Sequence, residues 1–356
     1  CGTPPGVPAE TERAFGRRGS VCRVSRGFAS GSRSGEGAVM EALRGIVDEI
    51  WRYETDFKGQ AWIDWVRDHA EVPVLTSCLY LSFVFYVPDL LKGSQPLKLR
   101  SAFAAWNLTL CAFSVVGSVH TLPTLLENLF KHGFLYTVCR DPEDWYLNGP
   151  TGLWVGLFIF SKIPELLDTA FLVMQQKRVI FLHWFHHATV MLYCWHAYHT
   201  RVAPGLWFAA MNFLVHSIMY LYYGAMACKL NWLATPFAPM ITTVQILQMA
   251  VGSAVTVTSA IEHRRGGDAA CKVDPANYKL GLTMYGSYLC LFSMLFLNKY
   301  FGAARKPGGA KTDKICGVEI GRGGPVDAAG RFEDFSKSSA SGSSSPSGGL
   351  NRKKVS

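Results

Sequence analysis

Hydrophobic residues gather in one block of the chain, from about residue 73 to residue 302, and more polar segments flank this block. Within it, apolar stretches recur at close to the roughly 20 residues that an α-helix needs to cross a bilayer. The Gly and Pro residues inside these stretches are tolerated in membrane helices. The pattern predicts an all-α membrane protein with seven transmembrane helices, at residues 73–91, 101–126, 151–174, 180–199, 204–227, 236–260 and 278–302.

The ends of the chain differ in composition from the central block. Residues 1–39 are rich in Gly, Ser and Arg and lack the apolar stretch of a signal peptide. They are either a leader that precedes a start at Met40 or a disordered tail. Residues 40–72 predict an amphipathic, lumen-facing segment, and residues 73–302 form the transmembrane domain. Residues 303–356 predict a disordered basic tail.

Composition supports the membrane class and argues against nucleic-acid binding. Hydrophobic residues make up 49% of the chain, charged residues make up 17%, and the net charge is +9. Much of the positive charge lies in the tails, and no basic stripe with interleaved aromatic residues is present. A membrane protein with phosphate-bearing partners accounts for the charge better than a nucleic-acid partner. The ten cysteines include no CxxC pair of the kind that binds zinc.

The short loops on the two sides of the membrane carry equal numbers of lysine and arginine residues, so they do not decide the orientation. The lysine and arginine residues near the C-terminus decide it instead. The chain also ends in Lys353-Lys354-Val355-Ser356, which looks like the dilysine signal that retrieves proteins to the endoplasmic reticulum from a cytosolic tail. These features predict a cytosolic C-terminus and, with an odd number of spans, a luminal N-terminus. The flanking basic residues are Lys299, Arg305, Lys306, Lys311 and Lys314.

Two cysteines lie in polar loops that this orientation turns toward the oxidising lumen. Cys139 precedes the third predicted span, and Cys271 precedes the seventh. Thiols in such a compartment form disulfides. We therefore predict a Cys139–Cys271 disulfide that ties the second and third helices to the sixth and seventh, with two free thiols as the alternative.

Charged residues occupy one face of the third span. Lys162, Glu165, Asp168 and Thr169 are spaced by three, three and one, so they share a face of an α-helix. Each unpaired charge at this depth costs about 2.5–3.5 kcal/mol, which predicts that the face looks into a polar interior. A structural salt bridge between Lys162 and Glu165 would account for two of the charges and leave Asp168 without a partner.

Three further spans carry polar faces at a similar depth. Counting about 1.5 Å per residue, the four faces converge on the cytosolic side of the membrane centre. This convergence predicts one buried site. Its histidines could form a metal cluster or perform acid–base or nucleophilic chemistry. The residues are His183, His186 and His187 in the fourth span, Asn212, His216, Met219, Tyr220 and Tyr223 in the fifth, and Thr242, Gln245 and Gln248 in the sixth.

These four motifs resemble, in order and without substitution, the signatures of the ELO family of very-long-chain fatty-acid elongases. The signatures are KxxExxDT, HxxHH (a histidine box), NxxxHxxMYxYY and TxxQxxQ, and they stand here at residues 162–169, 183–187, 212–223 and 242–248. The resemblance implies a seven-helix bundle that encloses a narrow acyl tunnel in the endoplasmic reticulum. It implies an acyltransferase, a 3-oxoacyl-CoA synthase that condenses acyl-CoA with malonyl-CoA and releases CO2 and CoA, with no cofactor. Family members also carry the cysteine pair in the same loops.

Arg178 and the stretch from Phe181 to Tyr198 resemble the branch of the family that acts on saturated and monounsaturated chains. The resemblance further implies the reductases and the dehydratase of the elongation cycle as partners. It leaves the oligomeric state open, including a homo-oligomer.

The chemistry of condensation assigns expected roles to the polar residues. We expect His186 to take the acyl group, and His216 to act as a second base or to hold the oxyanion. Asp168 is expected to orient a histidine, and Asn212, Gln245 and Gln248 to donate to developing negative charge. Cys194 is interpreted as a packing residue. Lys162, Glu165, Thr169, Tyr220 and Tyr223 are expected to help bind substrate, and Lys177, Arg178 and Lys229 are candidates for the CoA phosphates or for loop charges that set topology.

Two other classes of protein share parts of the pattern. A desaturase or hydroxylase binds two irons through several histidine boxes, whereas only four of the ten histidines here lie on the converging faces. A seven-helix receptor or transporter would explain the number of spans. It would not explain three histidines beside Lys, Glu and Asp at one depth.

Overall fold

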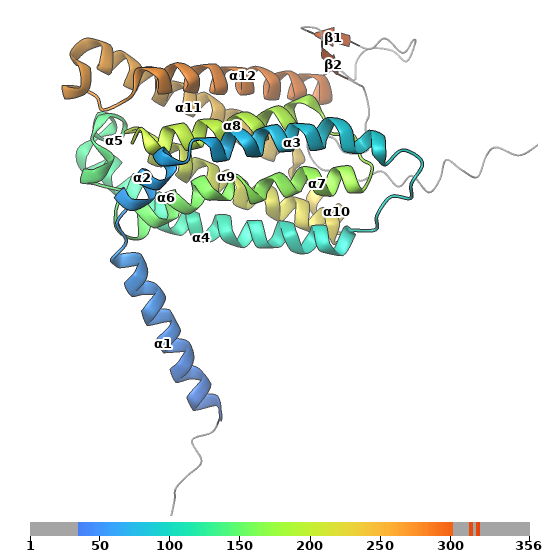
Figure 1. The fold of residues 1–356 in the computed structure, drawn as a ribbon, viewed down its shortest axis with the longest axis horizontal. Coiled ribbons are helices and arrows are strands. Elements are labelled where there is room, and N and C mark those ends of the chain that lie inside the picture. The colour runs from blue at the N-terminus through green and yellow to red at the C-terminus, as the bar shows by residue number, and fades with distance from the viewer. Residues whose placement is uncertain (1–34, 302–312, 316–317, 321–356) are drawn as a thin grey trace, which may run out of the picture. The chain divides into compact units, whose positions relative to one another are not determined.

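The computed structural model describes residues 35–301, 313–315 and 318–320 (Figure 1). The chain divides into two compact units, Cys1–Ile50 and Trp51–Ser356. The dilysine end and most of the basic residues used to predict the orientation lie outside the described residues, as does nearly all of residues 1–39 and 303–356.

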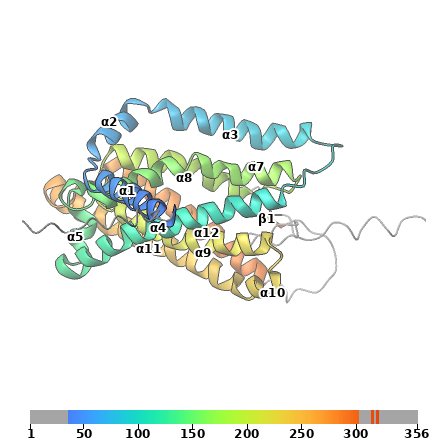
Figure 2. The same ribbon diagram turned by 90° about the horizontal axis from the view of Figure 1, so that it is seen from below.

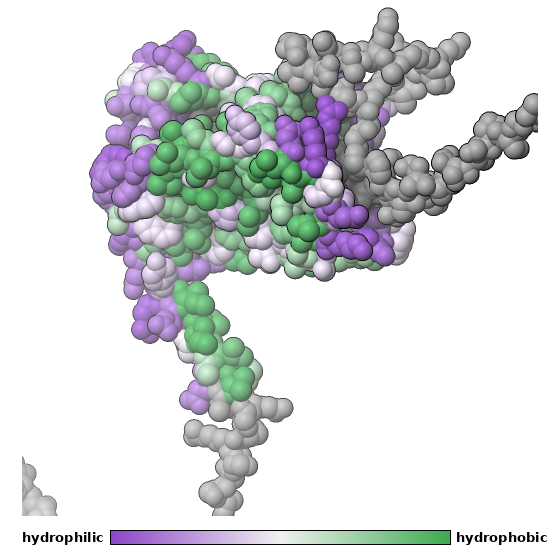
Figure 3. Space-filling model, turned by 45° about the vertical axis from the view of Figure 1, so that its right-hand side comes forward, coloured by the Kyte–Doolittle hydropathy of each residue, from purple (hydrophilic) through white to green (hydrophobic). Residues whose placement is uncertain are grey.

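The described part of the first unit belongs to helix α1 (Gly35–Thr55), which begins before Met40. Its apolar residues recur at helical spacing and are exposed along one face, and charged residues occupy the opposite face. Figure 3 shows this apolar stripe along the helix. The helix is therefore amphipathic, with Val39, Leu43, Ile46, Val47 and Ile50 on the apolar face and Glu41, Arg44 and Asp48 on the polar face.

The second unit is a bundle of helices that run side by side (Figures 1 and 2). Four short 3-10 turns separate some of them, at Pro142–Asp144, Pro164–Leu166, Thr235–Phe237 and Gly267–Ala269. The α-helices are α2 (Gln60–Asp68), α3 (Glu71–Leu90), α4 (Arg100–His132), α5 (Phe134–Cys139), α6 (Gly149–Ser161), α7 (Leu167–Met174), α8 (Phe181–His199), α9 (Gly205–Ala227), α10 (Asn231–Ala234), α11 (Ala238–Gly266) and α12 (Pro275–Tyr300).

Two short strands are described within the segment that we predict to be disordered. Strand β1 (Asp313–Ile315) pairs with strand β2 (Val318–Ile320) in antiparallel register, Asp313 opposite Ile320. Apart from this hairpin, the regular structure of the described residues is helical, which confirms a helical fold class.

Within the part of the chain that the structure describes, five helical stretches are long and apolar enough to cross a membrane: Glu71–Leu90, Arg100–His132, Gly205–Ala227, Asn231–Ala269 and Pro275–Tyr300. They coincide with five of the seven predicted spans. The third predicted span is divided into α6 and α7 at Pro164, because proline lacks the N–H that would continue the helix. The fourth, α8, has 19 residues and carries five histidines, which lower its hydropathy.

The surface of the bundle also fits a multi-pass membrane protein. Figure 3 shows hydrophobic side chains over its middle and hydrophilic side chains at both ends. Val119, in the middle of α4, is 64% exposed, and Leu79 of α3 is 73% exposed. Such contiguous exposed apolar surface is unfavourable in water and favourable in lipid.

Close packing inside the bundle depends on small residues where two helices approach. A Cβ atom at Gly117 of α4 would lie 2.5 Å from the ring of Phe213 on α9. At Gly252 of α11, a Cβ atom would lie 2.4 Å from the ring of Tyr285 on α12. Both pairs of helices therefore pack with an aromatic ring against bare backbone, as is common between membrane helices.

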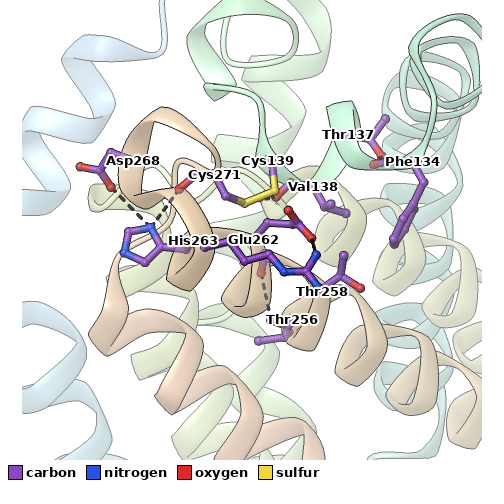
Figure 4. The surroundings of a disulfide bond; sticks show 12 residues. Phe134, Thr137, Val138, Cys139, Thr256, Thr258, Glu262, His263, Asp268 and Cys271 are labelled. Atoms are coloured by element: carbon purple, nitrogen blue, oxygen red, sulfur yellow. Dashed lines mark hydrogen bonds and ion pairs between the residues drawn. A yellow bond between two sulfur atoms is a disulfide. The ribbon is translucent and has the colours of Figure 1, made fainter.

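Cys139 and Cys271, the two cysteines singled out from the sequence, form a disulfide across 132 residues (Figure 4). The main chain pairs beside it, because Lys272 N donates to the carbonyl oxygen of Cys139 at 3.0 Å. The His263 ring nitrogen Nδ1 lies 3.0 Å from the carbonyl oxygen of Cys271. The bond thus joins the end of α5 to the loop between α11 and α12. Figure 1 shows α5 at the opposite end of the bundle from α10.

Candidate active site

A cavity of about 160 Å³ lies between six helices of the bundle. The four predicted polar faces all contribute to it, so their convergence is observed. Its polar lining residues are Asn107 of α4, Asp168 of α7, Arg178 of the α7–α8 loop, His183, His186 and His187 of α8, Asn212, His216, Tyr220 and Tyr223 of α9, and Gln245 and Gln248 of α11; Phe103, Leu182, Met249 and Phe292 are among the apolar ones.

Lys162 and Glu165 do not line the cavity but lie buried behind it. Lys162 Nζ forms an ion pair with Glu165 Oε1 at 2.7 Å, and Ser161 Oγ donates to the same oxygen at 2.8 Å. The alternative of a structural salt bridge is therefore observed. Pro164 and its 3-10 turn, which contains Glu165, interrupt the α-helix between α6 and α7, so the motif does not lie on one continuous α-helix.

Asn212 connects the buried ion pair to His216. Lys162 Nζ donates to Asn212 Oδ1 at 3.3 Å, and Asn212 Nδ2 lies 3.0 Å from His216 Nε2. An ammonium group can only donate, so the amide oxygen must face Lys162 and the NH2 group must face the histidine. His216 Nε2 is then the acceptor, and the neutral ring carries its proton on Nδ1. The ion pair thereby fixes the tautomer of His216.

His183 is held by a second chain of hydrogen bonds. Its Nε2 lies 2.9 Å from Thr169 Oγ1, and that hydroxyl lies 2.9 Å from the hydroxyl of Tyr80 on α3. Thr169 is fully buried and does not line the cavity. The last residue of the KxxExxDT motif therefore positions a histidine.

The rings of His186 and His187 complete the cluster. His187 lies between its neighbours, with ring centroids 4.7 Å from His183 and 5.4 Å from His186. The ring of Tyr288, on α12, packs 5.0 Å from that of His186, and its hydroxyl donates to the His186 main-chain oxygen. Among the described residues, no group hydrogen-bonds to the imidazole nitrogens of His186. Its ring is therefore open to a ligand in the cavity.

Asp168 has two hydrogen-bond partners, and neither is a histidine. Trp106 Nε1 donates to Oδ1 at 2.7 Å, and the Tyr220 hydroxyl donates to Oδ2 at 2.9 Å. This differs from our expectations, in which Asp168 lacked a partner within its own span and directly oriented a histidine. The reason is that α4 and α9 supply neutral donors that helical spacing along the third span cannot reveal.

The two glutamines of the motif on α11 line the cavity. Gln245 Nε2 contacts the sulfur of Met219 at 3.3 Å, and Gln248 is buried in the lining. Thr242, the first residue of that motif, does not reach the cavity, because its hydroxyl donates to the main-chain oxygen of Ala238. Two of the three motif residues on α11 therefore line the cavity.

The basic candidates for the CoA phosphates lie at different positions. Arg178 lines the cavity, whereas Lys177 and Lys229 do not. Lys177 lies in the α7–α8 loop, where partial burial, with a smaller effect of nearby Arg100, lowers its pKa to about 8. Lys229 is exposed in a left-handed backbone conformation after α9. Arg178 is thus the candidate nearest to the histidines.

The sequence reasoning missed residues that lie outside the motifs. Trp106 and Asn107 of α4, Tyr80 of α3 and Tyr288 of α12 contact motif residues or line the cavity. Asn107 was the detectable signal, because an amide in an apolar span predicts a polar neighbour. The other three are aromatic residues, which are common in membrane helices whatever their role.

The structure also gives the position of Cys194 and of the side chains that could act as metal ligands. Cys194 is buried in the main hydrophobic core and does not line the cavity, in agreement with a packing role. Across the residues that the structure describes, no group of three or more His, Cys, Asp or Glu side chains has an arrangement that could hold a metal ion.

Comparison with known proteins identifies the family. The model of the ELO: GNS1/SUR4 family matches residues 65–308. Fatty acid elongase 3 of Trypanosoma brucei brucei is 45% identical over 278 residues, covering 71% of this chain and 92% of the relative. Fatty acid elongase 3 of Trypanosoma cruzi is 40% identical over 296 residues, covering 77% and 97%.

Another relative, very long chain fatty acid elongase 4 of Trypanosoma cruzi, is 42% identical over 271 residues, covering 76% of this chain and 94% of its own length. The family match, residues 65–308, contains the helices and the motifs that line the cavity. The chain therefore belongs to the ELO family, the GNS1/SUR4 family of fatty acid elongases.

Proposed function

We propose that this protein catalyses the condensing step of fatty-acid elongation through an acyl-enzyme on His186. The supporting observation is the difference between the histidines. His183 and His216 each use a ring nitrogen in a hydrogen bond, whereas no described residue hydrogen-bonds to a ring nitrogen of His186 or His187. Of these two, His187 is buried and packed against the rings of Tyr80, His183 and His186, so His186 is the more accessible. A nucleophile needs a free lone pair facing its substrate.

In the first step, a ring nitrogen of neutral His186 attacks the thioester carbonyl carbon of acyl-CoA. The C–S bond breaks, CoA leaves as a thiolate, and the ring proton moves to that sulfur. The product is a neutral acyl-imidazole and free CoA, so no other reactant is needed. The open side of the ring and the buried surroundings, which exclude water, favour acyl transfer over hydrolysis.

In the second step, malonyl-CoA loses CO2, and the resulting enolate carbon attacks the acyl carbon on His186. A carbon–carbon bond forms, the C–N bond breaks, and the 3-oxoacyl-CoA leaves. The ring nitrogen then takes up one proton from the solvent, which is the proton that the overall reaction consumes. Both the enolate and the tetrahedral intermediate carry negative charge on oxygen. Preorganised donors in a water-poor site stabilise such charge strongly.

His216 is suited to donate to that oxygen rather than to act as a base. Its Nε2 accepts from Asn212, so the proton on Nδ1 is available to an oxyanion. Gln245 and Gln248 of α11 supply further amide donors in the cavity lining. Asn212 acts mainly through His216, because its amide is already engaged with Lys162 and the histidine.

Topology and location follow from the ends of the bundle. The disulfide lies at the α5 end, which supports an oxidising luminal compartment there. His183 and Arg178 lie near the start of α8, toward the other end, so CoA would approach from the cytosol. We propose seven membrane spans in the endoplasmic reticulum, with α6, its 3-10 turn and α7 together forming the third and α8 the fourth.

The substrates proposed are long-chain acyl-CoA, saturated or monounsaturated, and malonyl-CoA, with no cofactor or metal. Arg178 would bind a CoA phosphate at the mouth of the cavity, and Lys177 would assist it. The product is a 3-oxoacyl-CoA, so a reductase, a dehydratase and a second reductase must act next to regenerate a saturated chain.

The test is an elongation assay with labelled malonyl-CoA and acyl-CoAs of different length and saturation, using membranes that contain the full chain. His186→Ala should abolish the product, which is two carbons longer than the acyl-CoA supplied. His199→Ala, at the far end of α8, is the matched control and should retain activity. Absence of product with folded wild-type protein and every acyl chain would contradict the proposal.

A further inference from the structure

Trp106 lies outside all four sequence motifs, yet it hydrogen-bonds to a residue of the cavity wall. Its Nε1 donates to Asp168 Oδ1 at 2.7 Å, while the Tyr220 hydroxyl donates to Oδ2 at 2.9 Å. An indole N–H can only donate, so its role in this contact does not change with protonation. One carboxylate thus joins α4, α7 and α9.

The carboxylate is connected to His216 through Tyr220. The rings of His216 and Tyr220 meet edge to face, with centroids 5.3 Å apart and an angle of 88° between their planes. Tyr220 is almost fully buried, so its ring has little freedom once its hydroxyl is held by Asp168. Packing by Tyr220 therefore limits rotation of the His216 ring.

A second chain of contacts reaches His216 through Asn212. Asn212 donates to His216 Nε2, and Asn212 is held by Lys162. The hydrogen bond from Asn212 sets which nitrogen of His216 carries the proton, but a single hydrogen bond leaves the ring free to rotate about it. The contact with Tyr220 restricts that rotation, so the two contacts together fix the direction of the Nδ1–H bond.

We infer that Trp106 is a positioning residue for carbon–carbon bond formation, because it orients His216 through Asp168 and Tyr220. This inference rests on the proposed function, in which His216 donates to the oxyanion of the second step. Trp106 does not line the cavity itself, although Phe103 and Asn107 of the same helix do. Its indole N–H acts through Asp168, while its ring packs in the cluster that contains Tyr220, a contact that a substitution by another aromatic residue keeps.

The inference predicts a split between the two half-reactions. His186, the proposed nucleophile, is contacted by His187 and Tyr288 and lies outside the chain from Trp106 to His216. Loss of the indole donor should slow condensation and spare acylation. A tryptophan that only packed α4 against its neighbours would affect both steps alike.

The experiment uses the full purified chain in lipid nanodiscs and measures two quantities. The first is the CoA released from acyl-CoA alone, and the second is the 3-oxoacyl-CoA formed after malonyl-CoA is added. Trp106→Phe removes the donor and keeps an aromatic ring, and Trp106→Tyr keeps both a ring and a donor. The control is Trp207→Phe, which removes an indole hydrogen bond to Thr137 away from the cavity.

We expect Trp106→Phe to release CoA at the wild-type rate and to form product roughly 10- to 100-fold more slowly, the loss expected for a hydrogen bond to a charged group. Trp106→Tyr should recover most of the product rate, and Trp207→Phe should match the wild type in both steps. Two results would overturn the inference: a product rate for Trp106→Phe equal to that of the wild type, or an equal loss in both steps.

The same data separate this inference from the proposed function. Wild-type protein that releases no CoA until malonyl-CoA is added would overturn the acyl-enzyme. In that case the product rates of Trp106→Phe and Trp106→Tyr would still decide whether the indole donor positions the site.

Discussion

Lys162 Nζ donates to Asn212 Oδ1 at 3.3 Å, and this contact turns the NH2 group of the Asn212 amide toward His216. The same Lys162 atom is paired with Glu165 at 2.7 Å, so its position is fixed from the opposite side. A charge pair that does not face the cavity thus sets the tautomer of a histidine that does.

Asn212→Asp should slow condensation strongly. A carboxylate cannot donate to His216 Nε2, so a neutral ring would move its proton to Nε2 and donate to the new carboxylate. That tautomer lacks the proposed Nδ1–H donor, and the product rate should fall roughly 10- to 100-fold. The measurement is single-turnover product formation. Asn128→Asp, at a hydrogen-bonded amide of α4 away from the cavity, is the control and should change the rate by less than about twofold.

Lys162→Met should destabilise the bundle more than the double variant Lys162→Met/Glu165→Leu. Removing one partner of a buried ion pair leaves the other charge uncompensated and costs about 3–5 kcal/mol, whereas replacing both with apolar groups is often close to neutral. Thermal unfolding in detergent should show a larger fall in Tm for the single variant. A larger fall for the double variant would mean that the pair itself supplies the stability. Neither variant should condense, because His216 loses its support through Asn212.

Gly117→Ala should lower the stability of the bundle by about 1–3 kcal/mol, since the new methyl group would push into the Phe213 ring. The matched control is Gly286→Ala on α12, where a Cβ atom meets no atom within 4 Å. That control should be neutral or slightly stabilising, because alanine favours a helix more than glycine does. Equal Tm values for the two variants would show that α4 and α9 are not in close contact at Gly117.

Lys177 predicts how substrate binding depends on pH. Its pKa is lowered to about 8, so its positive charge is lost as pH rises through 8, well before that of an ordinary lysine. If it assists CoA binding, KM for acyl-CoA should be constant below about pH 7.5 and should rise above pH 8. Lys177→Arg should abolish that rise, because arginine stays charged. A rise that persists in Lys177→Arg would assign the pH effect to another group.

The lowered pKa of Lys177 also predicts how stability depends on pH, and here a rise in pH is favourable, whereas it weakens substrate binding. A lysine whose pKa is lower in the folded state than in the unfolded state destabilises the fold while it is charged in both. The free energy of unfolding should therefore increase from about pH 8 toward pH 10.5 and stay level below pH 8. Lys177→Gln should remove this part of the pH dependence.

The sequence was sufficient for the parts of the fold and site that follow from one-dimensional spacing. Helical periodicity and depth brought His183, His216 and Gln245 to one level, and the structure has them around one cavity. The loop positions of Cys139 and Cys271 were enough to pair them. These features depend on rise per residue and on which side of the membrane each loop lies.

Other parts of the site depend on which helices become neighbours, and spacing does not encode this. Asp168 could not be assigned its partners, because Trp106 lies 62 residues earlier, on another helix, and is an aromatic residue of a kind common in membrane helices. The break at Pro164 was not predicted either, since proline is tolerated in many membrane helices. Lys162 and Glu165, on either side of this proline, form a buried pair that contacts Asn212, so two expected substrate contacts are instead supports for His216.

The central claim is that His186 carries the acyl chain, and it is tested most directly by mixing purified protein with acyl-CoA in the absence of malonyl-CoA. The two quantities to measure are the CoA released per protein and the intact mass of the rapidly quenched protein. The account predicts one equivalent of CoA and a mass increase of one acyl group, both absent in His186→Ala and present in His199→Ala. Wild-type protein that elongates when malonyl-CoA is supplied, but releases no CoA and gains no mass without it, would contradict the acyl-enzyme.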